Sequence, residues 1–365
     1  MANQLHAAKA AKNDEFYTQY EDIECEMNSY IEFNNDVFRD KTILCPCDDP
    51  EWSNFTKYFA ANFERLGLRK LISTSYANSV GNQSTSLFEM NSPKYDANKH
   101  DKHGKIFVLE RDTSVTSRID YNDIKFEYLD GDGDFRSEEV TKLRDEADII
   151  VTNPPFSLLR DFVEWIMKAK KSFIIMANKN AITYKEIFPL IKDNKIWTGF
   201  TSINGGRWMI LPKNIKIKST HTKVKENGDV VLNVAGVCWF TNIDHGKRHE
   251  ELLLMTMADN LKYNQKLRKK LEKDFGEIKY QHYENYDAIE VPLVEAIPSD
   301  YNGNMGVPIT FMNNYNVNQF EIIGMGEDNG SGFSGGVWKG GSKSCLVDGK
   351  AMFKRIFIRK RRFEV

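Results

Sequence analysis

The sequence carries almost no net charge and no long apolar run, and each of these shortages narrows the classes of protein to which it can belong. Among its 365 residues, 50 Lys and Arg face 52 Asp and Glu, a formal net charge of −2. A polyanionic partner would therefore have to meet local basic patches. No uninterrupted stretch of about 18 apolar residues occurs, so we expect no membrane-spanning helix and no membrane partner.

Cysteine is also scarce and follows no paired framework. The five cysteines stand at positions 25, 45, 47, 238 and 345, an odd number that suits a reducing compartment better than secretion. Cys45 and Cys47 flank a proline, but no second Cys or His pair lies at ligand spacing, so we predict no metal site. Residues 1–12 lack the apolar run of a signal peptide. The expected location is the cytoplasm.

What the sequence does contain is the pattern of an α/β domain. Apolar residues make up 41% of the chain and aromatic residues 12%, which is enough for a substantial buried core. From Lys41 onward, short apolar runs alternate with stretches of helical periodicity, as is typical of a mostly parallel sheet flanked by helices. The expected strands cover residues 42–45, 70–74, 106–109, 126–129, 148–152 and 173–177.

Helices and closing strands are expected around these runs. Ser53 is a good N-cap for a helix that Gly67 can end, a second helix follows Ser157, and a third covers residues 184–192. A further strand is expected at 195–197, and paired apolar runs predict a hairpin of residues 208–211 with 234–241. Residues 78–105 lack apolar periodicity and predict a long polar excursion.

The composition changes near residue 243. Beyond it, charged, aromatic and turn-rich sequence replaces the alternating pattern, and the glycine-rich residues 324–341 predict a loop before a final strand at 352–358. We therefore predict an α/β fold whose Rossmann-like sheet occupies residues 1–243, with a smaller C-terminal region at 244–365.

Four residues that directly follow the expected strand at 148–152 carry the chemistry: Asn153, Pro154, Pro155 and Phe156. Open α/β sheets bind ligands at the carboxyl ends of their strands, and this turn lies at such an end. An Asx-Pro turn that merely ends a strand would explain the backbone geometry but not the Phe.

These residues suit methyl transfer to an exocyclic amino nitrogen of an aromatic base. Such a nitrogen is a poor nucleophile because its lone pair is delocalised into the ring. The side-chain oxygen of Asn153 and the carbonyl oxygen of Pro154 can each accept one amino hydrogen, and the prolines fix the backbone. Phe156 offers a flat face for a base swung out of a duplex, unless it is a core residue at the start of the helix.

Several motifs give the chain a family resemblance. The segments DEFYTQ at 14–19, CPCDDP at 45–50, DGDGDFR at 130–136 and NPPF at 153–156 resemble those of the EcoRI-type adenine-N6 DNA methyltransferases in order and spacing. The resemblance continues through TYKE at 183–186, WFTN at 239–242, NYDAI at 285–289 and DYNGNMGVPITF at 300–311. It spans nearly the whole chain.

The resemblance implies S-adenosylmethionine as the methyl donor, double-stranded DNA as the substrate and the adenine N6 amine as the acceptor. It also implies a methyltransferase domain at 1–243 and a DNA target-recognition region at 244–365. The enzyme would be the protective half of a restriction–modification pair, beside an endonuclease that cuts the same site, or an orphan enzyme.

The resemblance also assigns residues to the donor site. Phe16, Tyr17 and Thr18 would pack beside the methionine part of the donor. Cys45 and Cys47 belong to the turn that would line its central portion, and Asn153 would border the donor as well as the base.

Acidic residues complete the expected donor site. Asp48 or Asp49 would accept hydrogen bonds from the ribose hydroxyls, although either is also a plausible loop acid or cap before the next helix. Asp132 or Asp134 would take the adenine amino group of the donor. Their D-x-D-x-D spacing resembles a calcium loop, but the helix–loop–helix frame of such a loop is missing. The usual glycine-rich turn after the first strand, and an acid after the second, are absent.

Two groups of basic residues are candidates for contacts with DNA phosphates, although each is equally well explained as a solvated surface. One group surrounds the predicted hairpin and the other lies on a predicted helix. The first contains Lys213, Lys216, Lys218, Lys223 and Lys225, and the second contains Lys266, Arg268, Lys269, Lys270 and Lys273. Base readout is expected from Asn, Gln and Arg side chains beyond residue 243.

Two other functions stay open at the level of sequence. The same tetrapeptide serves flat amino or amide groups in general, so the acceptor could be RNA or a glutamine amide of a protein. A DNA-binding protein that has lost turnover is the third hypothesis, although such a protein would have no need to keep both Asn153 and Phe156.

Overall fold

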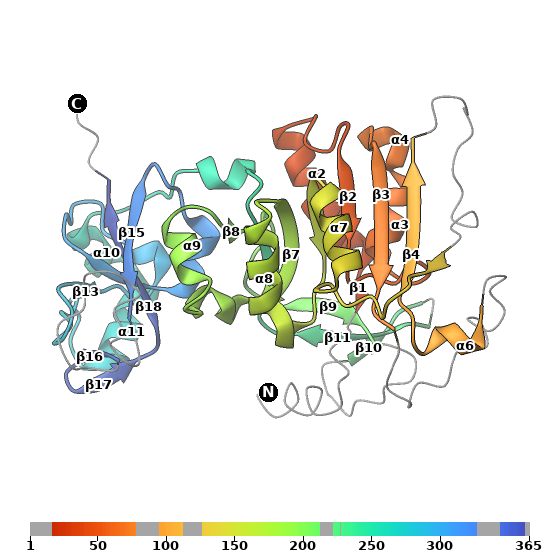
Figure 1. Cartoon of the computed structure of the whole chain (residues 1–365). Helices are drawn as coiled ribbons and strands as arrows, with labels where there is room; N and C mark the ends of the chain where they lie inside the picture. The colour runs from red at the N-terminus through yellow and green to blue at the C-terminus, as the bar shows by residue number, and fades with distance from the viewer. Residues whose placement is uncertain are drawn as a thin grey trace. The chain divides into compact units, whose positions relative to one another are not determined.

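A computed structural model describes residues 17–77, 95–111, 126–211, 222–226, 228–326 and 344–361. The chain divides into two compact units, whose elements Figure 1 shows in chain order from red to blue. The first unit consists of Met1–Lys179 and Gly199–Asp244, and the second of Asn180–Thr198 and His245–Val365.

The first unit is built on a mixed sheet. Its strands in this unit lie in the order β5 (Glu127–Tyr128), β4 (Lys105–Glu110), β3 (Lys70–Ser75), β2 (Thr42–Cys45), β6 (Ile149–Thr152), β7 (Ser172–Asn178) and β12 (Val237–Thr241). The strands β3, β2, β6 and β7 are parallel, whereas β4 runs antiparallel to β3 and β12 antiparallel to β7. The six strands expected from residues 42 to 177 are confirmed, and the expectation of a mostly parallel sheet holds for its centre only.

The order of the parallel strands creates a topological switch point. From β2 the chain passes to β3 on one side, and it later returns to β6 on the other side of β2. In open α/β sheets, ligands bind outside the carboxyl ends of the strands at such a point. The turns that follow β2 and β6 therefore meet where a ligand is expected.

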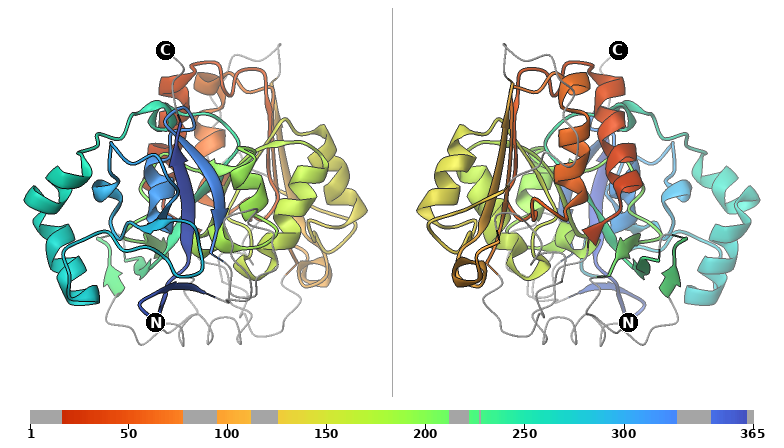
Figure 2. Two further views of the ribbon diagram at one scale, coloured as in Figure 1. Left: turned by 90° about the vertical axis from the view of Figure 1, so that its left-hand side faces the viewer. Right: turned by 90° about the vertical axis from the view of Figure 1, so that its right-hand side faces the viewer.

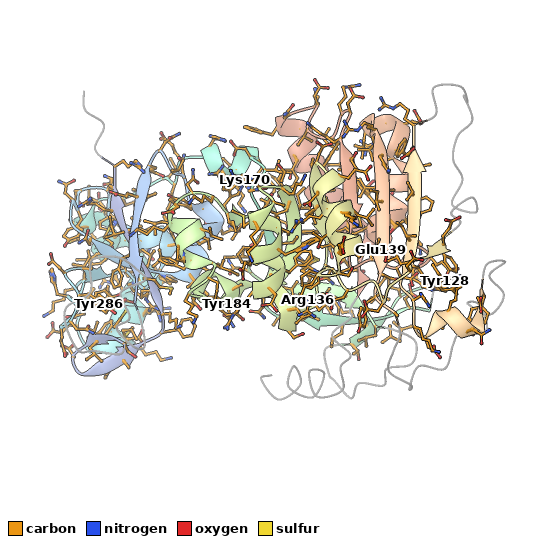
Figure 3. All side chains as sticks on the ribbon, viewed as in Figure 1. Tyr128, Arg136, Glu139, Lys170, Tyr184 and Tyr286 are labelled. Atoms are coloured by element: carbon orange, nitrogen blue, oxygen red, sulfur yellow. The ribbon has the colours of Figure 1, made fainter. Side chains whose placement is uncertain are left out.

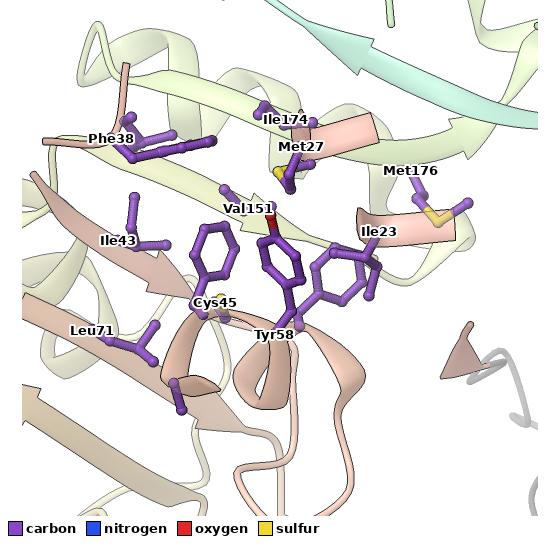
Figure 4. Close-up of a cluster of buried hydrophobic side chains, with 14 of the residues drawn as sticks. Ile23, Met27, Phe38, Ile43, Cys45, Tyr58, Leu71, Val151, Ile174 and Met176 are labelled. Atoms are coloured by element: carbon purple, nitrogen blue, oxygen red, sulfur yellow. The ribbon is translucent and has the colours of Figure 1, made fainter. Parts of the chain in front are cut away.

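Helices cover both faces of the sheet. Figure 2 shows α2 (Tyr20–Phe33) and α3 (Asn54–Ala61) on one face, and α7 (Glu138–Glu146) and α8 (Leu159–Lys168) on the other. Figure 4 shows side chains of α2 and α3, for example Ile23 and Tyr58, in one buried cluster with Val151 of the sheet. Because neighbouring strand residues point to opposite faces, the fully buried strand β6 supplies side chains to both layers.

The expected helix between Ser53 and Gly67 is interrupted. Ser53 caps α3 as predicted, since its hydroxyl accepts from the Phe55 N–H, and Gly67 ends the short α4 (Phe63–Leu66) with a left-handed φ of 63°. The break falls at Asn62, whose backbone departs from helical values at φ −104° and ψ 11°, and whose side chain and N–H both donate to the Tyr58 carbonyl.

Two further expectations differ from the structure. Of the helix expected at 184–192, only α9 (Phe188–Lys192) forms, and Pro189 in its first turn cannot donate a backbone hydrogen bond. The 3-10 turn η3 (Lys179–Thr183) precedes the expected range. In the expected hairpin, β9 (Arg207–Ile210) pairs with β11 (Val230–Val234), whereas residues 237–241 form β12 of the main sheet. Gly236, with φ 80°, lies in the turn between β11 and β12.

A second small sheet completes the first unit. Its order is β1 (Tyr17–Thr18), β9, β11 and β10 (Thr222–Val224), with antiparallel pairing throughout. Two short elements, α6 (Ala97–His100) and the 3-10 turn η2 (Phe156–Leu158), lie in the connections of this unit.

The second unit contains a four-stranded sheet of its own, in the order β13-β14-β18-β15, and a two-stranded sheet of β16 and β17. The glycine-rich stretch is largely outside the described residues, which resume at Ser344. The strands of the second unit are β8 (Trp197–Thr198), β13 (Ile289–Glu290), β14 (Met305–Pro308), β15 (Phe320–Met325), β16 (Cys345–Val347), β17 (Lys350–Met352) and β18 (Arg355–Lys360). Its other elements are η4 (Gly246–His249), α10 (Met257–Tyr263), α11 (Gln265–Phe275), η5 (Val294–Ala296) and η6 (Ile309–Asn314).

Candidate active site

The tetrapeptide that the sequence singles out forms a tight strand-to-helix turn. Asn153 directly follows β6, Pro154 is buried, and Pro155 precedes η2, with its carbonyl accepting from the Leu158 N–H at 3.0 Å. The side-chain oxygen of Asn153 is buried. Phe156 is half-buried and packs against the core between the sheet and α2 and α3. An amide acceptor and an aromatic ring thus stand three residues apart at the switch point.

Asp48, in the turn after β2, is tied into a buried polar network. Its carboxylate accepts from the Ser53 hydroxyl at 2.7 Å and from the Thr152 hydroxyl at 2.5 Å. Its backbone N–H donates to the Thr74 carbonyl at 2.8 Å, and its carbonyl accepts from the Ser73 hydroxyl at 2.7 Å. These bonds join the carboxyl ends of three parallel strands to the start of α3.

Asp49 takes part in a different set of contacts. Its carboxylate accepts from the Glu51 N–H at 2.9 Å and forms an ion pair with Lys105 at 3.1 Å, while Glu51 pairs with the same ammonium group at 2.8 Å. The Lys105 ammonium also lies over the Phe126 ring, 4.9 Å from its centre. Burial disfavours the charge on this lysine, but the two carboxylates outweigh burial and raise the pKa of Lys105.

The acidic loop at 130–134 is organised by its own residues. The Asp132 carbonyl accepts from the Ala77 N–H at 2.7 Å, and the exposed Asp132 carboxylate accepts from the Asp134 N–H at 3.0 Å. The Arg136 side chain donates to both carboxylate oxygens of Asp134, and these hydrogen bonds lower the pKa of Asp134. Glu139 accepts from the backbone of Gly131, so both Arg136 and Glu139, labelled in Figure 3, fix the loop.

The donor-site residues expected at 16–18 are described to different extents. Phe16 lies outside the described residues, and Tyr17 is described only as backbone in β1. The Thr18 hydroxyl donates to the Met176 sulfur at 3.0 Å, and the Thr18 carbonyl accepts from the Asn54 side chain at 2.7 Å.

The two cysteines of the 45–49 turn occupy different environments. Cys45 is fully buried in the hydrophobic cluster of Figure 4, and burial raises the pKa of its thiol well above the ordinary value. A contact between Cys45 and a ligand would therefore use its backbone. Cys47 is half-buried. None of the five cysteines, all of which are described, forms a disulfide.

The structure therefore brings three predicted segments to one edge of the sheet. The turn at 45–49 and the tetrapeptide at 153–156 are linked through Asp48 and Thr152, and the loop at 130–134 joins the end of β3 through Ala77. Sequence reasoning missed Thr152 and Lys105. The available signals were a hydroxyl at the last position of the buried strand β6 and a lysine at the first position of β4.

The basic candidates are described only in part. Lys213, Lys216 and Lys218 lie outside the described residues. Lys223, on β10, is exposed with its ammonium group 4.4 Å from the centre of the Trp208 ring, and Lys225 lies 3.5 Å from Glu21.

The second basic group lies on α11 in the second unit. Arg268 and Lys269 are exposed, and Lys270 forms an ion pair with Asp274 at 3.0 Å. Lys266 lies 3.8 Å from Glu295. The predicted helix is confirmed, and its exposed basic side chains face solvent.

No helix in the described part of the chain has the length and apolar character needed to cross a lipid bilayer. Within the same residues, no group of three or more His, Cys, Asp and Glu side chains is arranged to hold a metal ion.

Comparison with known proteins identifies the family. The model of a family described as adenine-specific methyltransferase EcoRI matches residues 4–361. The type II methyltransferase M.EcoRI of Escherichia coli is 41% identical over 361 residues, which cover 99% of this chain and 97% of the relative. The type II methyltransferase M.MpnI of Mycoplasma pneumoniae is 35% identical over 322 residues, 87% of this chain and 84% of the relative.

A second mycoplasma relative agrees with this result. The type II methyltransferase M.MgeORF184P of Mycoplasma genitalium is 34% identical over 326 residues, 87% of this chain and 85% of the relative. No solved structure matches the chain. The family resemblance inferred from the motifs is confirmed, and with it the α/β methyltransferase fold. The chain belongs to the EcoRI family of adenine-specific methyltransferases.

Proposed function

We propose that this enzyme methylates the N6 amine of an adenine that is swung out of duplex DNA, with S-adenosylmethionine as the donor. The observation that carries the proposal is the position of Asn153, whose buried side-chain oxygen lies at the carboxyl end of β6, at the switch point, three residues before a half-buried phenylalanine. Membership of an adenine-specific methyltransferase family supports it. S-adenosylmethionine, when bound, supplies a methyl group on a positively charged sulfur.

The tetrapeptide prepares the amine for attack. The Asn153 side-chain oxygen and the Pro154 carbonyl each accept one N6 hydrogen, which returns electron density to the nitrogen. Phe156 stacks on the flipped adenine and offsets part of the cost of unstacking it. The N6 nitrogen then forms a bond to the methyl carbon as the carbon–sulfur bond breaks, its electron pair stays on sulfur, and one N6 proton leaves to water.

The residues around the switch point fit the donor. The side chains of Asp49 and Glu51 are each 20% exposed, so carboxylate oxygens are available there to hydroxyl or ammonium groups. We assign the ribose contact to Asp49, because Asp48 is only 6% exposed and already accepts two hydroxyl hydrogen bonds. The exposed Asp132 and its neighbour Asp134 border the adenine of the donor. Tyr17, Thr18 and the backbone of Cys45 and Cys47 line the rest.

The DNA would be held outside this site by basic side chains. We assign phosphate contacts to Lys223 and Lys225 of the first unit and to Arg268, Lys269 and Lys270 of α11. Base readout is assigned to residues 244–365, with methyl transfer in 1–243. Replacing Arg268 and Lys269 together by Gln should lower DNA affinity and reduce the slope of log affinity against log salt by about 1.8, since each phosphate contact contributes about 0.9.

The protein would act in the cytoplasm, where chromosomal DNA and the donor are found. Relatives named as type II methyltransferases point to a restriction–modification pair, in which a nuclease cutting the same site is the partner of this enzyme in the cell.

The test is transfer of a radiolabelled methyl group to duplex DNA, RNA or protein by the purified enzyme. We expect label in DNA, recovered as N6-methyladenine, and a loss of turnover of at least about 100-fold for Asn153→Ala at little cost to DNA affinity. Asn62→Ala, at the opposite end of α3 from Ser53, is the control and should be fully active. Label found only in RNA or protein, or an active Asn153→Ala variant, would contradict the proposal.

A further inference from the structure

The hydrogen bond between Thr152 and Asp48 links two turns that the sheet itself no longer holds together. The backbone ladder between β2 and β6 pairs Ile43 with Ile149 and Leu44 with Ile150. Thr152 lies two residues beyond that pairing, is fully buried, and donates its hydroxyl to an Asp48 carboxylate oxygen at 2.5 Å. This side-chain bond spans the switch point where β2 and β6 have ceased to pair, while on its other side Thr152 still pairs with Ile175 of β7.

The position of Asp48 is fixed from the other side. Its second carboxylate oxygen accepts from Ser53 at the start of α3, and its backbone is bonded to Ser73 and Thr74 of β3. Ser73 is fixed in turn by a 2.6 Å hydrogen bond between its hydroxyl and that of Thr56 on α3. The Thr152 hydroxyl therefore meets an acceptor that cannot follow it if β6 shifts.

We infer that Asp48 is a positioning residue, which acts through Thr152 to hold Asn153 in register with the turn at 45–49. The inference rests on the proposed function, because it gives a reason for the position of the amide that accepts the N6 hydrogen. Thr152 is the residue immediately before Asn153, so a displacement of one moves the other. A displacement of about 1 Å at a reacting group can slow turnover about 100-fold.

A positioning role and a ribose-binding role for Asp48 predict different effects of mutation on donor affinity and on turnover. A ribose ligand acts on donor affinity, and Thr152 would then be irrelevant to turnover. A positioning residue acts on turnover at saturating donor and DNA. Removing the Thr152 hydroxyl should then lower kcat as much as removing the Asp48 carboxylate does.

The experiment compares Thr152→Val, which removes the hydroxyl at nearly constant volume, with Thr152→Ser, which restores it. Thr241→Val is the matched control, because Thr241 is also fully buried on the main sheet and donates to a carbonyl, that of Phe173, at 2.7 Å. For each variant we would measure kcat, KM for DNA, donor affinity by calorimetry and thermal unfolding.

We expect Thr152→Val to lower kcat about 30- to 100-fold, with donor affinity and KM for DNA within about twofold of the parent. Thr152→Ser should recover kcat to within about threefold, and Thr241→Val should retain it. Equal kcat in Thr152→Val and the parent, or an equal loss in Thr241→Val, would overturn the inference.

Asp48→Asn gives an independent measurement should Thr152→Val prove poorly folded. Its amide keeps the size of the carboxylate but has one acceptor oxygen in place of two, so it cannot accept from both Ser53 and Thr152. Reduced kcat with unchanged donor affinity supports positioning, whereas donor affinity weakened more than about tenfold at unchanged kcat overturns it.

The failure of the inference and that of the proposed function are distinguishable. If Asn153→Ala is inactive while Thr152→Val is fully active, only the positioning role is wrong. If Asn153→Ala retains turnover, the proposed role of the tetrapeptide is wrong, whatever Thr152→Val does.

Discussion

A buried ion pair in the second unit gives the sharpest prediction about stability. Glu290 on β13 is fully buried, and it accepts from the guanidinium of Arg355 on β18 at 2.8 to 3.2 Å. The Tyr283 hydroxyl donates to the same carboxylate. Arg355→Met removes the positive charge and leaves the carboxylate enclosed without its cationic partner.

The size of the effect follows from this burial. Removing one partner of a buried ion pair costs about 3 to 5 kcal/mol, because an uncompensated charge stays behind. Total stabilities of natural domains are about 5 to 15 kcal/mol, so the variant should lose a large part of its resistance to unfolding. Arg359→Met is the control, since its ion pair with Glu321 on the neighbouring strand is about half-exposed and should cost at most about 1 kcal/mol.

The assay is urea unfolding followed by circular dichroism. In Arg355→Met the buried carboxylate of Glu290 loses its cationic partner, and this loss is the cause of the destabilisation. Adding Glu290→Gln should recover part of the loss by removing the charge. A cost for Arg355→Met no greater than that for Arg359→Met, or no recovery in the double variant, would refute the reasoning.

Three further predictions concern the loops of the candidate site. The pKa of Asp134 lies below its ordinary value of 3.8 because the Arg136 side chain donates to its carboxylate. Its contribution to stability is therefore complete above pH 3.8 and is lost as the pH falls through the lower, folded value. Arg136→Gln should raise this pKa in an NMR titration, and an unchanged pKa would contradict the assigned cause. Ser53→Ala should lower the free energy of unfolding in urea by about 2 kcal/mol, because Ser53 caps α3 and also donates to Asp48. Ser137→Ala, which removes a cap alone, should lower it by about 1 kcal/mol. Equal losses would argue against a contribution from the hydrogen bond between Ser53 and Asp48. Gly133→Ala should weaken donor binding, because the added Cβ would meet the Ser75 carbonyl at a backbone φ of 79°. Gly228→Ala, at a φ of 86° with open space around it, carries the same backbone strain without the clash. Calorimetry should therefore show weaker donor binding for the first variant only, and equal donor affinities would contradict this reasoning.

Much of the fold was predictable because its signals are local. Residues 149–151 form an apolar run that ends at Thr152, and all four side chains are buried. Ser53 and Gly67 cap helical segments as their residue types require. The helix broken at Asn62 and the antiparallel edge strands were not predictable. The helix is broken by one residue whose backbone departs from helical values, and the antiparallel edges depend on which strands become neighbours.

The sequence by itself determined the chemistry of the site: an amide, two prolines and an aromatic ring at the end of a buried strand, which is information held in consecutive residues. Only the tertiary structure decided what the surrounding polar residues do. Asp48 and Thr152 are 104 positions apart, and Lys105 is 56 positions from Asp49. Their partners are set by the order of the strands in the sheet, and no local pattern encodes that order, because it results from burying the faces of all the strands and helices together.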